Sequence, residues 1–202
     1  MERLEKTAEK LRQRRFQARC FETAEQAGEA VLEVLGSGSV GIGGSRTVED
    51  MDLYEAIRAH GNQIVCHTLV PQGEKAAVRT KAMDADAYLC SANAITEEGL
   101  IVNIDGTGNR VAAMLFGPEK VIVVAGKNKI VKNVEEGILR TKRDCCPKNT
   151  RRLGKSTPCA LTGECGNCTT PERSCNATVI WEYPTRNVRE FYVFLVNEEL
   201  GW

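Results

Sequence analysis

Short apolar runs alternate along the chain with longer segments in which apolar residues recur at helical spacing. The clearest run is Lys120–Ala125, a mostly β-branched stretch between turn residues, which predicts a buried strand. Similar patterns predict strands at residues 16–21, 63–68, 86–92, 100–104, 178–183 and 190–196, and residues 39–47 are predicted to be a buried strand that runs into a glycine-rich turn. Helices are predicted between them, at residues 23–35, 46–59, 72–83, 110–115 and 134–143.

The regular alternation of strands and helices predicts an α/β fold, with a mostly parallel sheet and helices on both faces. Residues 1–22 are predicted to form an N-terminal amphipathic helix and a short strand, with Leu4, Ala8 and Leu11 on the face that the core should bury. Residues 23–202 are predicted to form the α/β domain, including a cysteine-rich segment at 145–175.

Composition excludes several classes of function. The 202 residues include 27 Lys and Arg and 27 Asp and Glu, so the net charge is zero and nothing suggests a nucleic-acid partner. No stretch reaches the roughly 20 apolar residues of a membrane span, and the N-terminus lacks the apolar core of a signal peptide. We therefore expect a cytoplasmic protein that has no membrane partner.

A glycine-rich turn follows the strand that begins at Ser39. Glycines there allow backbone N–H groups to approach an anion closely, and a helix N-terminus adds a favourable field. The turn is not the dinucleotide fingerprint, because Arg46 occupies the place of its third glycine. Glycines are also common in tight turns for steric reasons alone. The ligand-binding candidates in this turn are Gly41, Gly43, Gly44, Ser45 and Thr47.

The stretch from residue 85 to 109 contains two predicted strands, each followed by polar groups. Ligands of open α/β sheets collect outside the carboxyl ends of strands. The ligand-binding candidates here are Asn93, Thr96, Gly106, Thr107, Gly108 and Asn109.

Two carboxylates in the same stretch are candidates for catalysis. Glu97, expected to face the glycine-rich turn, is a candidate general base or nucleophile, and Asp105 is a second candidate. Both also suit ordinary polar turns. The histidines, His60 and His67, form no recognisable triad with a serine or an aspartate.

Six of the nine cysteines lie between residues 145 and 175. Four of them, Cys159, Cys165, Cys168 and Cys175, fall within 17 residues and include one Cys-x2-Cys pair, a spacing that lets two thiolates hold one ion. A metal site for zinc or an iron–sulfur cluster is one interpretation, and a loop of reduced thiols packed over the sheet is the other. Disulfides are less favoured in a reducing compartment.

Several motifs together resemble the LUD-domain proteins, known as lactate utilization proteins, in their small cysteine-containing branch. The motifs are Gly41-Ile-Gly-Gly-Ser-Arg-Thr47, Ala92-Asn-Ala-Ile-Thr-Glu-Glu-Gly99, Pro147-x-Asn149, Arg152, Thr157-Pro-Cys159, Thr162-Gly-x-Cys165, Cys168, Arg173-x-Cys175-Asn176 and Leu195-Val-x-Glu-x-Leu-Gly201. The resemblance implies a fold like that of glucosamine-6-phosphate deaminase, ribose-5-phosphate isomerase and CoA transferases (NagB/RpiA/CoA transferase-like). It also implies a role in oxidising lactate to pyruvate alongside iron–sulfur subunits.

Three hypotheses for function follow. In the first, the protein is a component of lactate or organic-acid metabolism that binds a small anionic metabolite at the strand-end loops and acts with iron–sulfur redox subunits. In the second, it is an isomerase or an acyl or CoA transferase acting on a sugar phosphate or CoA ester. In the third, it is a non-catalytic assembly subunit that docks through its N-terminal helix and cysteine loop. Association into a homo-oligomer is compatible with each.

Overall fold

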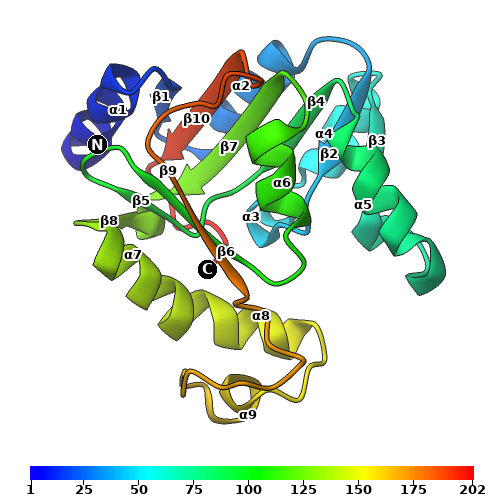
Figure 1. Ribbon diagram of the computed structural model, residues 1–202. Coiled ribbons are helices and arrows are strands. Elements are labelled where there is room, and N and C mark those ends of the chain that lie inside the picture. Colours follow the sequence, from blue (N-terminus) through cyan, green and yellow to red (C-terminus); the bar gives the residue numbers. More distant parts are fainter.

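The computed structural model describes residues 1–202 and contains two sheets (Figure 1). All neighbours in the six-stranded main sheet are parallel, in the order β1-β10-β7-β4-β2-β3. These strands are β1 (Gln17–Phe21), β2 (Ser39–Ile42), β3 (Gln63–Cys66), β4 (Ala87–Cys90), β7 (Lys120–Gly126) and β10 (Glu190–Val196). The predicted fold class is confirmed.

Helices cover both faces of the main sheet and enclose two apolar cores. One face packs against α1 (Glu2–Gln13), α5 (Lys75–Met83) and α6 (Asn109–Phe116), and the other against α2 (Ala24–Leu35), α3 (Arg46–Asp50) and α4 (Leu53–Ala59). Side chains of β7 alternate between the cores: Val121 and Val123 lie in the first, and Ile122 and Val124 in the second. This alternation is the two-residue period of a strand that is buried on both faces.

The N-terminal helix belongs to the first core. Leu4, Ala8 and Leu11 are buried as predicted, and Phe16 packs edge-on against Phe191 with ring centroids 5.0 Å apart. The following strand, β1, pairs with β10 at the edge of the main sheet. Residues 1–22 therefore share a core with the rest of the chain.

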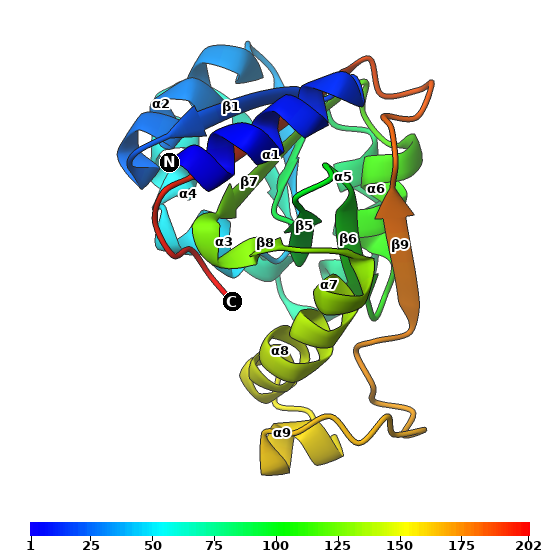
Figure 2. The ribbon, with the colours of Figure 1, turned by 90° about the vertical axis from the view of Figure 1, so that its left-hand side faces the viewer.

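A second, four-stranded sheet lies beside the main one (Figure 2) and was not predicted. Its order is β8 (Ile130–Val131), β5 (Ala94–Thr96), β6 (Ile101–Asp105) and β9 (Ala177–Trp181). β6 is antiparallel to both β5 and β9. Because β5 and β8 contain only three and two residues, neither carries a pattern long enough to predict a strand.

Two predicted helices differ from those observed. The one at 46–59 is divided into α3 and α4, because Asp52 adopts a left-handed backbone conformation with φ of 50°. The one at 134–143 is longer than predicted: α7 (Val134–Arg140) continues through a π-helical turn, Thr141–Cys145, into α8 (Cys146–Arg152).

The first residues of the cysteine-rich segment, from Cys145 to Arg152, are therefore helical and not part of a loop. Pro147 stands in the first turn of α8, where the missing N–H requires no partner. A further short helix, α9 (Pro158–Thr162), follows, and α8 and α9 lie together at one end of the molecule (Figure 1). None of the helices combines the length and apolar character needed to cross a membrane.

Candidate functional site

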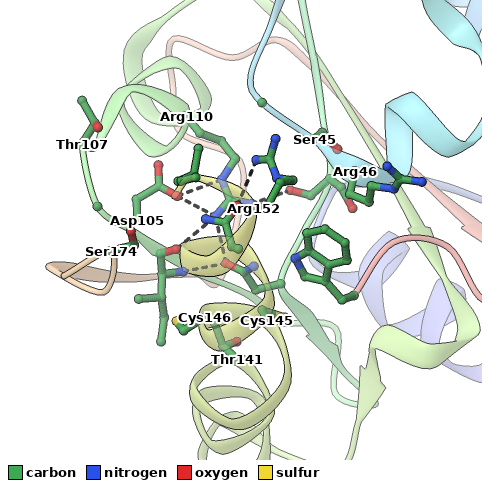
Figure 3. Close-up of a pocket in the computed structure, with 18 of the residues that line it drawn as sticks. Ser45, Arg46, Asp105, Thr107, Arg110, Thr141, Cys145, Cys146, Arg152 and Ser174 are labelled. Atoms are coloured by element: carbon green, nitrogen blue, oxygen red, sulfur yellow. Dashed lines mark hydrogen bonds and ion pairs between the residues drawn. The ribbon is translucent and has the colours of Figure 1, made fainter. Parts of the chain in front are cut away.

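A cavity of about 190 Å³ opens where several strands end. The loops after β2, β4, β6 and β7 contribute to its wall, and the helical segment from Thr141 to Arg152 closes another side (Figure 3). Lining residues from these elements include Gly44, Ser45, Thr47, Ser91, Asn93, Asp105, Gly106, Thr107, Asn109, Arg110, Lys129, Cys145, Cys146 and Arg152. The cavity thus combines the carboxyl ends of the main sheet with one end of the second sheet.

Arg110 fixes the relative position of two of these loops. Its guanidinium donates hydrogen bonds to the Asp105 carboxylate (2.5 and 2.9 Å), to the Ser91 carbonyl (3.1 Å) and to the Asn93 side-chain oxygen (2.8 Å). A further bond reaches the Ile104 carbonyl (3.2 Å). Most of this side chain is buried, so the Asp105 carboxylate is neutralised inside the wall of the cavity. Asp105 is therefore a structural partner of Arg110 in this arrangement.

Arg140 holds the opposite side. It donates to the backbone carbonyls of Asn93 (2.6 Å) and Asn128 (2.8 Å), and to the Cys145 sulfur (3.0 Å). These bonds connect the helical segment to the loops after β4 and β7. The shape of the cavity is therefore maintained by two buried arginines, whose N–H groups already donate hydrogen bonds to acceptors of the protein itself.

Lys129 lies at the inner end of the loop that follows β7, and only 3% of it is exposed. Its amine donates hydrogen bonds to the hydroxyls of Thr47 (2.7 Å) and Ser91 (2.8 Å). Burial lowers the pKa of this amine to about 7, and the nearby Arg140 and Arg110 act in the same direction. Lys129 is therefore a buried amine that titrates near neutral pH.

Other basic side chains of the wall have fewer hydrogen-bond or ion-pair partners. Arg79 has a buried Nε without a hydrogen-bond partner, and Arg152 approaches the Glu49 carboxylate only to 4.0 Å. His67 stays neutral near pH 7, because burial, together with Arg79, lowers its pKa to about 4. In total, the wall contains one side-chain carboxylate, that of Asp105, and six Lys or Arg residues: Arg46, Arg79, Arg110, Lys129, Arg152 and Lys155.

Most of the predicted ligand-binding residues line this cavity, and four do not. A Cβ atom at Gly41 would lie 2.2 Å from the Ala82 carbonyl oxygen, so this glycine permits close packing of β2 on α5. A Cβ atom at Gly43 would lie 2.8 Å from the Tyr88 hydroxyl of β4. The remaining two are Thr96 and Gly108. Thr96 is buried at the end of β5, where its hydroxyl accepts the Leu100 N–H (3.0 Å), and Gly108 precedes α6 with φ of 89°.

Glu97 lies outside the cavity, and the prediction that it faces the glycine-rich turn is wrong. Its carboxylate accepts a hydrogen bond from Arg3 (2.7 Å) of α1. The cause is the tight turn between β5 and β6, in which the Gly99 N–H bonds to the Thr96 carbonyl (2.8 Å) and directs the loop toward α1. The structure does not support Glu97 as a reacting group.

The four predicted metal ligands lie around a second, much smaller cavity of about 10 Å³. Cys146 joins Cys159, Cys165, Cys168 and Cys175 in its wall. In the structure, no three His, Cys, Asp or Glu side chains are already arranged as ligands around one point.

Hydroxyl and guanidinium groups surround the sulfurs of this second cavity. The hydroxyls of Thr157 and Thr150 lie 3.3 and 3.6 Å from the Cys159 sulfur. The guanidinium of Arg173 donates to the Cys175 sulfur (3.3 Å).

The basic residues of the main cavity were not predicted as ligand-binding residues, because isolated lysines and arginines are usually solvated. A signal for Lys129 is its place after the strand predicted at Lys120–Ala125, at the carboxyl end. Arg110 follows the loop after β6 in the same way. Arg152 belongs to the motifs that carry the family resemblance, whereas no signal marks Arg79, which comes from α5.

The fold and cavity define an α/β protein with a basic pocket at the strand ends. A model of the LUD domain matches residues 4–196, and the chain therefore belongs to the LUD domain family, which is associated with lactate utilization. No curated protein matches the chain. A DUF162 family protein from Deinococcus radiodurans has the same fold, with a TM-score of 0.57, 15% identity and 97% of each chain covered.

Two further structures show weaker similarity. Ribose 5-phosphate isomerase from Plasmodium falciparum has a TM-score of 0.34 and 10% identity over 55% of this chain and 53% of its own. The eIF2B beta subunit from Chaetomium thermophilum has a TM-score of 0.32 and 9% identity over 65% of this chain and 44% of its own. Similarity at this level carries no argument about function.

Proposed function

We propose that the main cavity binds a small organic anion, and that the protein is a cytoplasmic component of lactate or related organic-acid utilization. The observation that carries this proposal is the charge of the wall, where six Lys and Arg residues face a single side-chain carboxylate. Arg110 already neutralises that carboxylate, and Arg46 pairs with Asp50 (2.7 Å), so Arg79, Arg152 and Lys155 are the cations without a close counter-ion. A bound anion would supply it.

The groups available to such an anion come from both sides of the cavity. Arg79 offers its unpartnered Nε, and Arg152 offers a guanidinium with only a distant acidic neighbour. Arginine binds carboxylate or phosphate through two parallel N–H groups. At the opposite wall, α6 begins at Asn109, which lines the cavity, and the Asp105 carboxylate accepts the Val111 N–H in its first turn (3.4 Å).

Family membership supports a hydroxy acid or oxo acid as the anion. In this proposal, the cavity holds lactate or a similar acid while a partner iron–sulfur subunit accepts the two electrons released on oxidation to pyruvate. The chain's own residues bind and orient the acid.

A binding screen tests this proposal. We expect lactate or pyruvate to raise the melting temperature and to bind in calorimetry, whereas Arg152→Gln should weaken binding about tenfold or more, because a hydrogen bond to a charged group contributes about 1.5–3 kcal/mol. Arg143→Gln is the matched control, since that arginine is exposed and does not line the cavity.

The screen also separates the alternatives. Binding of sugar phosphates or CoA esters without hydroxy or oxo acids would favour an isomerase or transferase. Absence of binding by every anion tested would overturn the proposed function and leave an assembly subunit as the better hypothesis.

We also propose that the smaller cavity holds one metal ion. Cys159, Cys165, Cys168 and Cys175 remain the candidate ligands, and Cys146 is added as a fifth thiol in the same wall. A volume of about 10 Å³ is the space of roughly one water molecule, which favours a single zinc or iron ion over a cluster of several atoms. Binding would require the thiols to turn toward a common centre, and the ion would then crosslink α8 to residues 159–175.

A further inference from the structure

The hydrogen bonds around Lys129 have a defined direction. The Thr47 hydroxyl donates its proton to the Leu200 carbonyl (3.4 Å), and the Ser91 hydroxyl donates its proton to the Ala92 carbonyl (3.4 Å). Each hydroxyl oxygen must therefore accept from the Lys129 amine. A neutral amine has two N–H groups and one lone pair. Both N–H groups are satisfied in this arrangement, and the lone pair is left without a partner.

Burial of the amine favours the same neutral state. No carboxylate lies within ion-pair distance of Lys129, and the titratable or charged groups around it are Arg110 of α6, Arg140 of α7, Cys145 of the π-helical turn, Asp50 of α3 and Cys90 of β4. The two arginines repel an ammonium group, whereas Cys145 and Asp50 act in the opposite direction. A lysine that is desolvated and placed near other cations is an effective nucleophile at neutral pH.

The position of Lys129 in the cavity suggests what this nucleophile would meet. The amine is on the inner wall, whereas Arg79 and Arg152 line the same cavity with donors left for an anionic group. The cavity volume of about 190 Å³ suits a molecule of a few carbon atoms. A small compound with a carboxylate or phosphate at one end and a carbonyl carbon near it would fill both requirements.

We propose that the Lys129 amine captures the carbonyl group of a small anionic ketone or aldehyde, with a 2-oxo acid as the favoured class, and forms an imine. The nitrogen lone pair forms the new bond to the carbonyl carbon. The carbonyl oxygen leaves as water with the two amine protons, so no oxidant or reductant is needed. The inference rests on the proposed anion site, because the anionic group must bind for the carbonyl carbon to reach the amine.

Reductive trapping tests this inference. The purified protein is incubated with pyruvate and cyanoborohydride, which reduces an imine to a stable secondary amine, and the modified peptide is identified by mass spectrometry. We expect modification at Lys129, and a loss of at least tenfold in Lys129→Met and Lys129→Arg. The exposed neighbours Lys127 and Lys132 provide an internal control in the same segment.

The pH dependence provides a second measurement. Because only the neutral amine reacts and its pKa is about 7, trapping at pH 6 should be about tenfold slower than at pH 8. Modification of an ordinary exposed lysine continues to rise well above pH 8. Repeating the experiment with dihydroxyacetone phosphate distinguishes a phosphate-bearing substrate from a carboxylate-bearing one.

The outcomes are separable from those of the proposed function. Lactate, which has no carbonyl carbon to attack, reports on the anion site alone. Binding of lactate or pyruvate without trapping at Lys129 by either carbonyl compound overturns the imine and leaves the anion site intact. Modification spread evenly over Lys127, Lys129 and Lys132 also overturns it. The site of modification is mapped on the protein without any substitution, so this result does not depend on whether a variant folds.

Discussion

The main cavity and the cysteine-rich segment share a boundary but are held in different ways. The cavity is built on strand ends, and buried arginines connect its loops through several hydrogen bonds each. Residues 153–176 contain one short helix and no strand. Only Thr157, Cys159, Ala160 and Ser174 are buried there. The shape of the main cavity is therefore set by the strands and the buried arginines, whereas residues 153–176 bury few side chains and need a further stabilising interaction.

The two regions are also in contact. Cys146 and Ser174 line both cavities. Asn176 connects the segment to the loop after β6, because its backbone N–H bonds to the Asp105 carbonyl (3.0 Å) and its side chain to the Gly106 carbonyl (3.0 Å). If the cysteine-rich segment became less ordered, the structure of one wall of the main cavity should therefore change as well.

The largest effect should come from removing the arginine that connects the cavity loops. Arg110→Ala leaves the buried Asp105 carboxylate without its partner, and breaking a buried pair in this way costs about 3–5 kcal/mol of unfolding free energy. Urea denaturation measures it. Arg143→Ala, at an exposed pair with Asp144, should change the unfolding free energy by less than about 1 kcal/mol. Equal losses of unfolding free energy for the two substitutions would show that the buried Arg110–Asp105 pair stabilises the fold no more than an exposed surface pair does.

An intermediate effect is expected from the cysteine segment. Anaerobically purified protein should contain about one zinc or iron ion per chain, and chelation should accelerate proteolysis within residues 153–176 by about tenfold, because the ion is the missing restraint. Cys168→Ser should lose the metal, while Cys20→Ser, in a distant strand, should keep it. Folded protein that takes up no metal, even when zinc or iron is supplied, would show that the segment is ordered without it.

The smallest effect is expected at Glu97. Its pair with Arg3 is exposed on both sides, so Glu97→Gln should change the unfolding free energy by no more than about 1 kcal/mol. Anion affinity should be unchanged, since the carboxylate lies outside the cavity. Calorimetry with the tightest-binding ligand of the screen provides the measurement. A tenfold loss of affinity would show that Glu97 contributes to the anion site after all.

The sequence was sufficient to predict the strands of the main sheet and part of the cavity, for identifiable reasons. β7 is rich in β-branched residues and β10 in aromatic and aliphatic ones, both are long, and local pattern alone predicts such strands. The polar groups after β2 and β6 follow from the rule that ligands bind at the carboxyl ends of strands. These two arguments account for Ser45, Asp105 and Thr107 in the cavity wall.

The rest depends on tertiary contacts that leave no local pattern. The direction of Glu97 is decided by the four-residue connection between antiparallel strands β5 and β6, and β5 is too short to predict. Arg79 and Arg152 reach the cavity from helices far apart in the chain, and only the packing of those helices brings them together. Cys146 could not be added to the other thiols until its helix was known.

The strand order of the main sheet has a consequence for synthesis of the protein. β10 lies between β1 and β7, so the first strand made has no neighbour in the sheet until nearly the whole chain has left the ribosome. During this interval the apolar face of α1 and the free edge of β7 are without their final partners. Such pairings over long sequence separations form slowly and expose aggregation-prone surface. β1 therefore joins the sheet only after the chain through Val196 has been made.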